Sequence, residues 1–205
     1  MLFRSPQGIV VDRGGERFHD EGEDARKTHF ARWGARIAEC PDQIAYLILD
    51  ANGLRRSLPT ALAPVRADSI QGLATALGLD PAALETTIRE FNGSTDPNGD
   101  TPLNERKTQG LTPPKTRVAV ALTTPPFVAY PLRPGVTFTH FGVAVDDHLR
   151  VMRSNGTVAR NVFAAGMIMA ANVLGEGYLA GLGVTLATVF GRLAGEAAAR
   201  RSLEI

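Results

Sequence analysis

Residues 174–195, "LGEGYLAGLGVTLATVFGRLAG", place a glycine-rich loop directly before an apolar pattern of helical period. Glycines at 175, 177, 181 and 183 allow a ligand to approach the backbone amides closely. The first turn of a helix carries unpaired N–H groups and about half a positive charge. The stretch therefore predicts a helix from about Gly183 to about Arg200 whose start forms a cradle for a negatively charged group.

Three interpretations of this cradle stay open from the residues alone. Phosphate is the usual occupant, but phosphate loops of nucleotide folds normally follow the first strand, and no Lys-Ser or Lys-Thr pair opens this helix. A reduced flavin also suits the position, because a helix dipole stabilises the negative charge that collects at N1 and the C2 carbonyl of its ring. The structural interpretation is that the glycines only let a helix pack closely against a strand.

The composition bounds the class of protein. The 205 residues are 44 % hydrophobic and 21 % charged with a net charge of +1, which indicates one large or two small soluble domains and argues against nucleic-acid binding. The single cysteine, Cys40, cannot form an internal disulfide, and His19, His29 and His148 lack metal-ligand spacing, so we expect no metal. No export signal or membrane-length apolar run is seen, and a cytoplasmic location follows.

The first half of the chain predicts alternating strands and helices. The expected elements, in order, are a hairpin at 9–18 turning at Gly14 and Gly15; a helix within 21–40 with Phe30, Trp33, Ile37 and Cys40 on one face; a buried strand at 43–50 closed by a turn at 50–53; a helix at 68–79 with Asp68 as N-cap and Ile70, Leu73 and Leu77 as its stripe; and a helix at 80–93 that begins at Asp80 and Pro81 and stops at Gly93. Residues 93–117 predict a polar surface loop packed onto its surroundings.

The last third changes in character. Residues 125–152 alternate apolar and polar side chains, with a hairpin turn expected at Asp146-Asp147. Residues 161–169, "NVFAAGMIM", have the look of a strand buried on both faces. Since the chain opens almost at once on a strand pattern, we expect it to be a piece of something larger.

Several segments together resemble one known family. "NVFAAG" (161–166) and "GYLAGLGVTLATVFGRLAGEAAA" (177–199) resemble the C-terminal flavin-binding segment of the fumarate reductase/succinate dehydrogenase flavoprotein superfamily. Residues 8–24 resemble the second half of its substrate-capping domain, residues 78–92 its helical hairpin, and residues 134–146 the return to the flavin domain. Within it, "DRGGERFHDEGED", "GLTPPKT" and "ANVLGEGYLAG" look most similar to tricarballylate dehydrogenases and the related flavoprotein of cobalamin biosynthesis.

The resemblance implies an α+β fold in two parts. Residues 1–127 would form part of the capping domain, a small sheet plus a helical hairpin, and residues 128–205 the C-terminal strands and helix of an FAD-binding α/β domain. FAD would be held between two distant segments, of which the Rossmann half that grips the pyrophosphate is not in this sequence. We therefore expect a C-terminal fragment that binds FAD weakly or not at all on its own.

The resemblance also assigns catalytic positions. Arg4 falls on a relay arginine of the fumarate-reducing members, whereas their proton-delivering arginine falls on Ala25, next to Arg26. Their carboxylate-gripping histidine falls on Thr137 and its arginine partner on Tyr178, and these departures argue against fumarate reduction. A tyrosine suits a dehydrogenase, where it removes a proton while hydride leaves the neighbouring carbon. Tyr178 is equally well a ring packed over the flavin with a hydrogen-bonded hydroxyl.

The binding residues follow in the same way. Arg133, Thr137 and His140 are placed at the junction of cap and flavin domain to bind substrate, with Glu21 orienting Arg26. The plain alternatives are solvated arginines, a structural histidine and an acid at a helix start. The flavin would be held by Gly166, Met167, Gly181, Leu182 and Gly183, with Met167 replacing the glutamate usual in the superfamily.

The resulting functional hypothesis is an FAD-dependent enzyme that dehydrogenates a tricarballylate-like polycarboxylate to an alkene resembling cis-aconitate. Its electrons would pass to a membrane-associated partner. Alternatives are a ketosteroid-type or cobalamin-biosynthesis dehydrogenase, and a non-catalytic truncated remnant. The substrate, electron acceptor and oligomeric state are open from the sequence.

Overall fold

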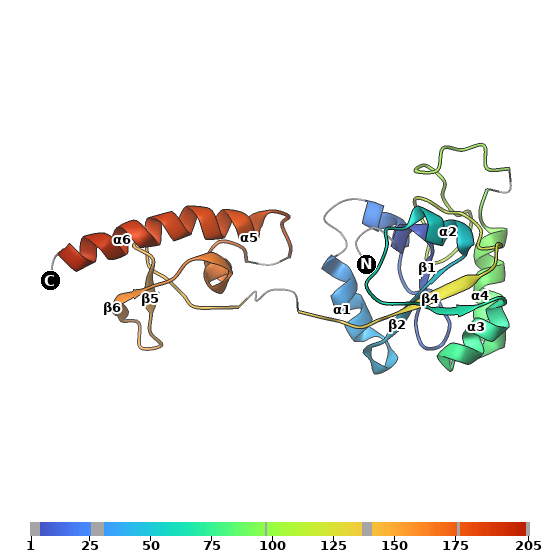
Figure 1. Cartoon of the computed structure of the whole chain (residues 1–205), viewed down its shortest axis with the longest axis horizontal. Helices are drawn as coiled ribbons and strands as arrows, with labels where there is room; N and C mark the ends of the chain where they lie inside the picture. The colour runs from blue at the N-terminus through green and yellow to red at the C-terminus, as the bar shows by residue number, and fades with distance from the viewer. Residues whose placement is uncertain (1–4, 26–30, 97, 137–140, 176, 204–205) are drawn as a thin grey trace. The chain divides into compact units, whose positions relative to one another are not determined.

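A computed structural model describes residues 5–25, 31–96, 98–136, 141–175 and 177–203, and the chain divides into two compact units, Met1–Gly135 and Val136–Ile205. Figure 1 shows the elements of both. The first unit contains, in order, η1 (Ser5–Gln7), β1 (Ile9–Val11), η2 (Glu21–Ala25), α1 (Arg32–Glu39), η4 (Pro41–Gln43), β2 (Ala45–Leu49), α2 (Ala51–Arg56), β3 (Val65–Ala67), α3 (Ile70–Leu77), α4 (Pro81–Gly93) and β4 (Phe127–Leu132).

The strands of the first unit form one antiparallel sheet in the order β1-β2-β4-β3. Ile48 pairs with Ile9 on one side and Ala129 on the other, so β2 is a central strand. All five residues of β2 are buried, which confirms the strand predicted from its continuous apolar run. The α+β fold class is confirmed.

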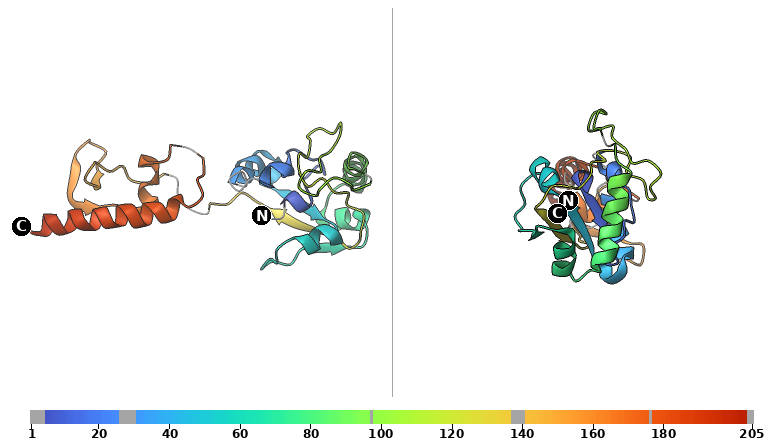
Figure 2. Two further views of the ribbon diagram at one scale, coloured as in Figure 1. Left: turned by 90° about the horizontal axis from the view of Figure 1, so that it is seen from above. Right: turned by 90° about the vertical axis from the view of Figure 1, so that its right-hand side faces the viewer.

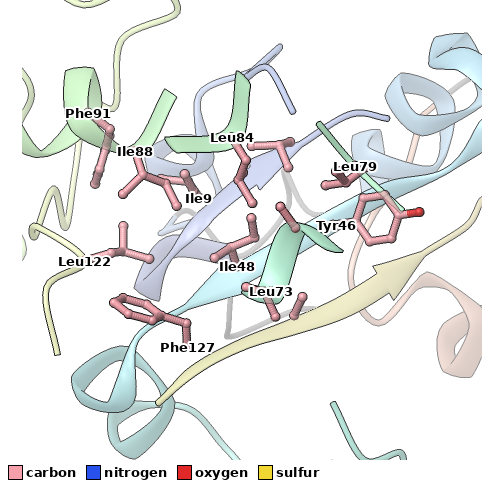
Figure 3. Packing of buried hydrophobic residues seen from close by; sticks show 13 residues of the cluster. Ile9, Tyr46, Ile48, Leu73, Leu79, Leu84, Ile88, Phe91, Leu122 and Phe127 are labelled. Carbon is pink, nitrogen blue, oxygen red and sulfur yellow. The ribbon is translucent and has the colours of Figure 1, made fainter. Parts of the chain in front are cut away.

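Helices cover both faces of this sheet (Figure 2). On one face, α3 and α4 pack Leu73, Leu84, Ile88 and Phe91 against strand residues that include Ile48, as Figure 3 shows. On the other face, α1 contributes Trp33 and Ile37 to a second cluster, which holds the alternate strand residues Val10, Leu47 and Val128. Because strand side chains alternate, one short sheet supports two cores.

The helix starts of the first unit follow their capping residues. Asp80 accepts a hydrogen bond from the amide of Ala82 at 2.9 Å ahead of Pro81, as predicted. The N-cap of α3 is Ser69, which accepts from Gly72 N at 3.0 Å, and not the predicted Asp68. Both residues have capping side chains, but only Ser69 stands directly before the first helical residue. α4 ends at Gly93, and α3 ends at Leu77, which is followed by the left-handed C-cap residue Gly78.

The turn predicted at residues 50–53 is wrong, because Asp50 begins α2. Its buried carboxylate accepts from Gly53 N at 2.7 Å and from the amides of Thr123 and Thr124 at 3.3 Å each. Asp-x-Asn-Gly is both a turn signal and a helix N-cap signal. In this chain Asp50 is the N-cap of α2, and its carboxylate is held in place by the amides of the distant residues Thr123 and Thr124.

The hairpin and helix predicted before residue 40 form only in part. β1 is followed by a tight loop closed by a single bridge between Val11 and Arg17, in which Gly15 (φ 79°) is left-handed and Gly14 is not. The helix predicted within 21–40 is split into η2 and α1. Trp33 and Ile37 are buried as predicted, Cys40 follows the helix end, and Phe30 lies outside the described residues.

The second unit contains a β-hairpin and one long helix. Its elements are β5 (Arg150–Met152), β6 (Val158–Phe163), the 3-10 helix η5 (Gly166–Asn172), and the consecutive α5 (Leu182–Thr185), π-helical η6 (Leu186–Phe190) and α6 (Gly191–Leu203). The predicted turn is confirmed, with Leu149 N donating to Asp146 O at 2.9 Å. The predicted last helix is confirmed as a run from Leu182 to Leu203.

The strand predicted at 161–169 to be buried on both faces is wrong. β6 ends at Phe163 and is largely exposed, and the apolar residues that follow turn into η5. Burial on both faces needs layers on both sides, whereas among the described residues β6 pairs with β5 in a two-stranded ribbon and contacts the helix α6.

The two compact units divide between Gly135 and Val136. β4, which we expected to open the flavin domain, pairs with β2 and β3 of the first unit. The assignment of residues 1–127 to a capping domain and 128–205 to a flavin domain stays a prediction.

The Asp50 contacts yield a prediction of stability. We expect Asp50→Ala to lower the free energy of unfolding by about 3 kcal/mol, because it removes three hydrogen bonds to a buried charged acceptor. Asp80→Ala, an exposed cap, is the control and should cost about 1 kcal/mol. Urea denaturation followed by Trp33 fluorescence measures both, and equal losses would contradict the tertiary role of Asp50.

Candidate functional site

A hollow of about 220 Å³ lies at the start of the long helix of the second unit. It is lined by Met167, Leu174, Tyr178, Leu179, Gly181, Leu182, Gly183 and Val184. The structure thus brings together Met167, Tyr178, Gly181, Leu182 and Gly183, which the sequence resemblance assigned to one flavin site. The side chains of Leu174, Leu179 and Val184 were missed, because an apolar residue in a glycine-rich loop carries no functional signal.

The glycines of the loop set the local backbone. Gly181 is the N-cap residue of α5 with φ 86°, a left-handed conformation that favours glycine. With no side chain at the N-cap, no side-chain oxygen caps the first turn of the helix. Leu182 N donates to Leu179 O at 3.2 Å, so the following amides of the first turn, from Gly183 on, are the ones that can bond a ligand acceptor at the edge of the hollow.

Met167 forms the wall opposite the helix start. A Cβ added to Gly183 would lie 3.3 Å from Met167 Sδ, so the start of η5 packs closely on the start of α5. Gly166, with φ 77°, makes the turn that brings Met167 there. An apolar hollow bordered by helix amides fits a planar flavin ring whose pyrimidine edge becomes negative on reduction.

The predicted substrate residues are only partly described. Arg4, Arg26, Thr137 and His140 lie outside the described residues. Arg133 follows β4, and its Nη1 donates to the carbonyl oxygen of Asp42 at 3.0 Å. Its role toward a substrate stays a prediction.

Glu21 is completely buried and is bound by Arg17. Its carboxylate accepts from Arg17 Nη2 at 2.6 Å, from Arg17 Nε at 3.1 Å and from Val10 N at 2.8 Å. Arg17 also donates to the carbonyl oxygens of Pro113 at 2.7 Å and Pro114 at 3.3 Å. The acid that we expected to orient Arg26 therefore anchors the segment 113–114 through Arg17.

Lys115 completes this buried group of charges. Its Nζ donates to the carbonyl oxygen of Gly8, and burial lowers its pKa to about 8, an effect opposed chiefly by Glu21. Asp20, also buried, accepts from Thr116 N at 3.0 Å and Gly22 N at 2.7 Å. Sequence reasoning missed Lys115, since a lysine in a Pro-rich polar loop is normally solvated.

The described residues contain neither a metal-ligand group nor a membrane-spanning helix. Within the described ranges, no group of three or more His, Cys, Asp or Glu side chains is arranged to hold a metal ion. In the same part of the chain, every helix is too short or too polar to span a lipid bilayer.

The Arg17–Glu21 contact yields a second prediction. We expect Glu21→Gln to lower the free energy of unfolding by about 3 kcal/mol, because it leaves the buried Arg17 without its anion. The matched control is Glu23→Gln on the same turn, where a 40 % exposed side chain lies 3.7 Å from His19, and it should change stability by less than about 1 kcal/mol. Urea denaturation compares the two variants, and a neutral Glu21→Gln would refute the anchoring role.

Known proteins share both the sequence and the fold. Residues 1–184 match the family described as FAD binding domain. The fumarate reductase (cytochrome) of Shewanella frigidimarina is 30 % identical over 206 residues, which cover 97 % of this chain and 33 % of that protein. The chain thus spans about a third of the length of such curated relatives.

Two solved structures have the same arrangement of elements. The open conformation of a flavocytochrome c3 fumarate reductase matches with a TM-score of 0.72 and 24 % identity, over 98 % of this chain and 34 % of that one. A 3-ketosteroid delta1-dehydrogenase from Sterolibacterium denitrificans matches with a TM-score of 0.66 and 22 % identity, over 97 % and 40 %. The chain therefore belongs to the FAD binding domain family, within the fumarate reductase flavoprotein superfamily that its sequence resembles, and its cofactor is FAD.

Proposed function

We propose that this chain supplies the substrate cap and the ring-binding end of an FAD-dependent dehydrogenase that oxidises a tricarballylate-like polycarboxylate to its alkene. One observation carries the proposal: Tyr178 lines the same hollow as Gly181, Leu182 and Gly183 at the helix start. A potential proton acceptor and the amides suited to a reduced flavin thus share one small space.

The chemistry at this hollow divides between two partners. Bound FAD would accept a hydride from one carbon of the substrate. Tyr178, as its phenolate, would take the proton from the neighbouring carbon and become the neutral hydroxyl. Leu174, Leu179 and Val184 give the hollow apolar walls, and once further polypeptide covers them they would keep water from both groups.

A polycarboxylate substrate also requires cations. We assign Arg26 and Arg4 to catalysis, and Arg133, Thr137 and His140 to the substrate carboxylates, as the resemblance implies. Arginine suits this role because its planar guanidinium pairs with a carboxylate through two hydrogen bonds. Glu21 would act on Arg26 only through the turn η2 that it anchors.

A second candidate is the reverse reaction, reduction of an activated C=C bond. The name of the Shewanella relative, a fumarate reductase, favours it. Ala25 and Tyr178 oppose it, because the reductases place arginines at the positions that the resemblance assigns to them. A ketosteroid-type substrate is a third candidate, since a ketosteroid dehydrogenase shares the fold.

Under this proposal, a further stretch of polypeptide binds the pyrophosphate of FAD. The second unit exposes several large apolar side chains, among them Ile168 (53 %), Val173 (50 %) and Val184 (71 %). Apolar surface of this kind is typical of a face that another polypeptide covers. We place the complete enzyme in the cytoplasm, with an electron acceptor at the membrane.

Titration of the chain with FAD tests this requirement. We expect binding too weak to survive gel filtration, because the hollow holds only the ring end of the cofactor and pyrophosphate contacts are missing. Absorbance near the flavin band and quenching of FAD fluorescence measure the bound fraction. A yellow protein that holds one FAD per chain would overturn the requirement for further polypeptide, but it would leave the proposed dehydrogenation untouched.

The reaction is tested in a chimera in which this chain replaces the matching third of the Shewanella fumarate reductase. We expect tricarballylate to reduce a dye acceptor, and Tyr178→Phe to lower kcat by about 100-fold with flavin content and KM nearly unchanged, because only the proton acceptor is lost. Tyr130→Phe on β4 is the control. A flavin-loaded chimera that reduces fumarate and leaves tricarballylate untouched would favour the second candidate.

A further inference from the structure

The buried charges of the first unit lie where a segment without regular structure meets the rest of the fold. The described residues of the segment 94–126 form no helix or strand, yet the stretch 113–117 is held by four contacts. Arg17 bonds the carbonyls of Pro113 and Pro114, Lys115 Nζ bonds the carbonyl of Gly8, and Thr116 N bonds Asp20. Among these, only the Lys115 contact puts a titratable group of the segment itself into the interior.

The anions beside Lys115 are already engaged by other donors. Glu21 accepts hydrogen bonds from Nε and Nη2 of Arg17 and from Val10 N. Asp20 accepts hydrogen bonds from Gly22 N and Thr116 N. The acceptor that Lys115 itself bonds is a neutral carbonyl, which can accept a hydrogen bond from a neutral amine as well as from an ammonium group. Lys115 is therefore able to remain bonded in the docked position without its proton.

The groups that face Lys115 come from the helices η2, α2 and α4 and from the loop before η2. Glu21 of η2 and Asp20 just before it favour the protonated form, as does the ring of Phe91 on α4, whose centroid is 5.6 Å from Nζ. Arg17, beside the same ring, and Arg56 of α2 disfavour it. The loss of hydration on complete burial outweighs the stabilising effect of Glu21, Asp20 and Phe91 on the charged form of Lys115. The ammonium group loses its water and gains a hydrogen bond to one carbonyl in return.

We propose that Lys115 is a proton-controlled clasp: in alkaline solution it gives up its proton as residues 113–117 dock on β1 and η2, so that docking tightens there as the pH rises. The sign follows from proton linkage. The pKa of Lys115 falls from 10.5 to about 8 on burial, so the docked segment binds fewer protons than the undocked one between these values. Docking is therefore independent of pH below about 8 and strengthens up to about pH 10.5.

The docked position of Lys115 bears on the placement of η1 and η2. η1 and η2 contact each other, and Glu21 ties η2 to β1 through Val10 N. In the sequence, η1 follows Arg4 and η2 precedes Arg26. Under the proposed function, Lys115 would be a positioning residue for both, but the clasp itself does not depend on that function.

The titration can be followed directly, because Lys27, Lys107 and Lys115 are the lysines of the sequence. In the full 205-residue chain labelled with ¹³C-lysine, with signals assigned by Lys27→Arg and Lys107→Arg, we expect the Lys115 signal to titrate near pH 8. In urea it should titrate near the ordinary lysine value, about 10.4. A Lys115 signal that titrates identically in the folded and the urea-unfolded chain overturns the proposal.

Solvent-exchange NMR tests the link to docking. We expect the protection of the Thr116 amide to rise by up to about 300-fold between pH 8 and pH 10.5, the factor that corresponds to the change in pKa. The Leu84 amide of α4, which bonds Asp80 O, reports global opening and is the internal control. Lys115→Met should abolish the excess rise at Thr116, and constant protection in the unsubstituted chain despite titration near pH 8 overturns the clasp.

Discussion

The ion pair between Arg17 and Glu21 is the contact on which the first unit depends. Both side chains are almost completely buried, at 4 % and 0 % exposure, so neither charge can rely on water. Glu21 fixes η2 to the backbone of β1, and Arg17 fixes the carbonyls of Pro113 and Pro114. An edge strand, a short helix and a segment far along the chain are thereby joined. Loss of either partner would leave an uncompensated charge in the interior.

This joint gives the segment 94–126 a defined place without helix or strand hydrogen bonds. A peptide stretch of that kind satisfies part of its backbone through side chains from elsewhere in the chain, and Arg17, Asp20 and Asp50 bond its carbonyl and amide groups. Asp50 links the other end of the segment to the start of α2 through Thr123 and Thr124. The first unit is thus a sheet with helices on both faces and a long polar segment, 94–126, bonded to the rest of the unit near residues 113–116 and near residues 123–124.

The second unit is organised differently, around glycine. Left-handed Gly166 and Gly181 turn the chain so that Met167 faces the start of the long helix. Its own core is small, built on Leu149, Met169 and Ala194. The hollow with Tyr178 is therefore shaped by backbone conformation more than by a large apolar core, which suits a site that holds the ring of a cofactor.

The sequence by itself determined the elements whose signals are local. The apolar run of β2, the Asp80-Pro81 start of α4 and the helix after Gly181 all depend on neighbours within a few residues, and each was confirmed. The glycine pattern also indicates the helix start at which the hollow lies. The resemblance covered the whole chain and supplied the cofactor, which the matching family confirms.

Tertiary structure decided everything that depends on a distant partner. Asp50 is a helix cap and not a turn because Thr123 and Thr124 bond it, and β6 is exposed because a two-stranded ribbon has no second layer to cover it. Lys115 is the clearest case. A lysine between prolines and a threonine looks solvated in sequence, and only the approach of Gly8, Arg17 and Phe91 from three other places in the chain buries it. Burial and pairing are properties of the folded interior, and no local pattern of residues encodes them.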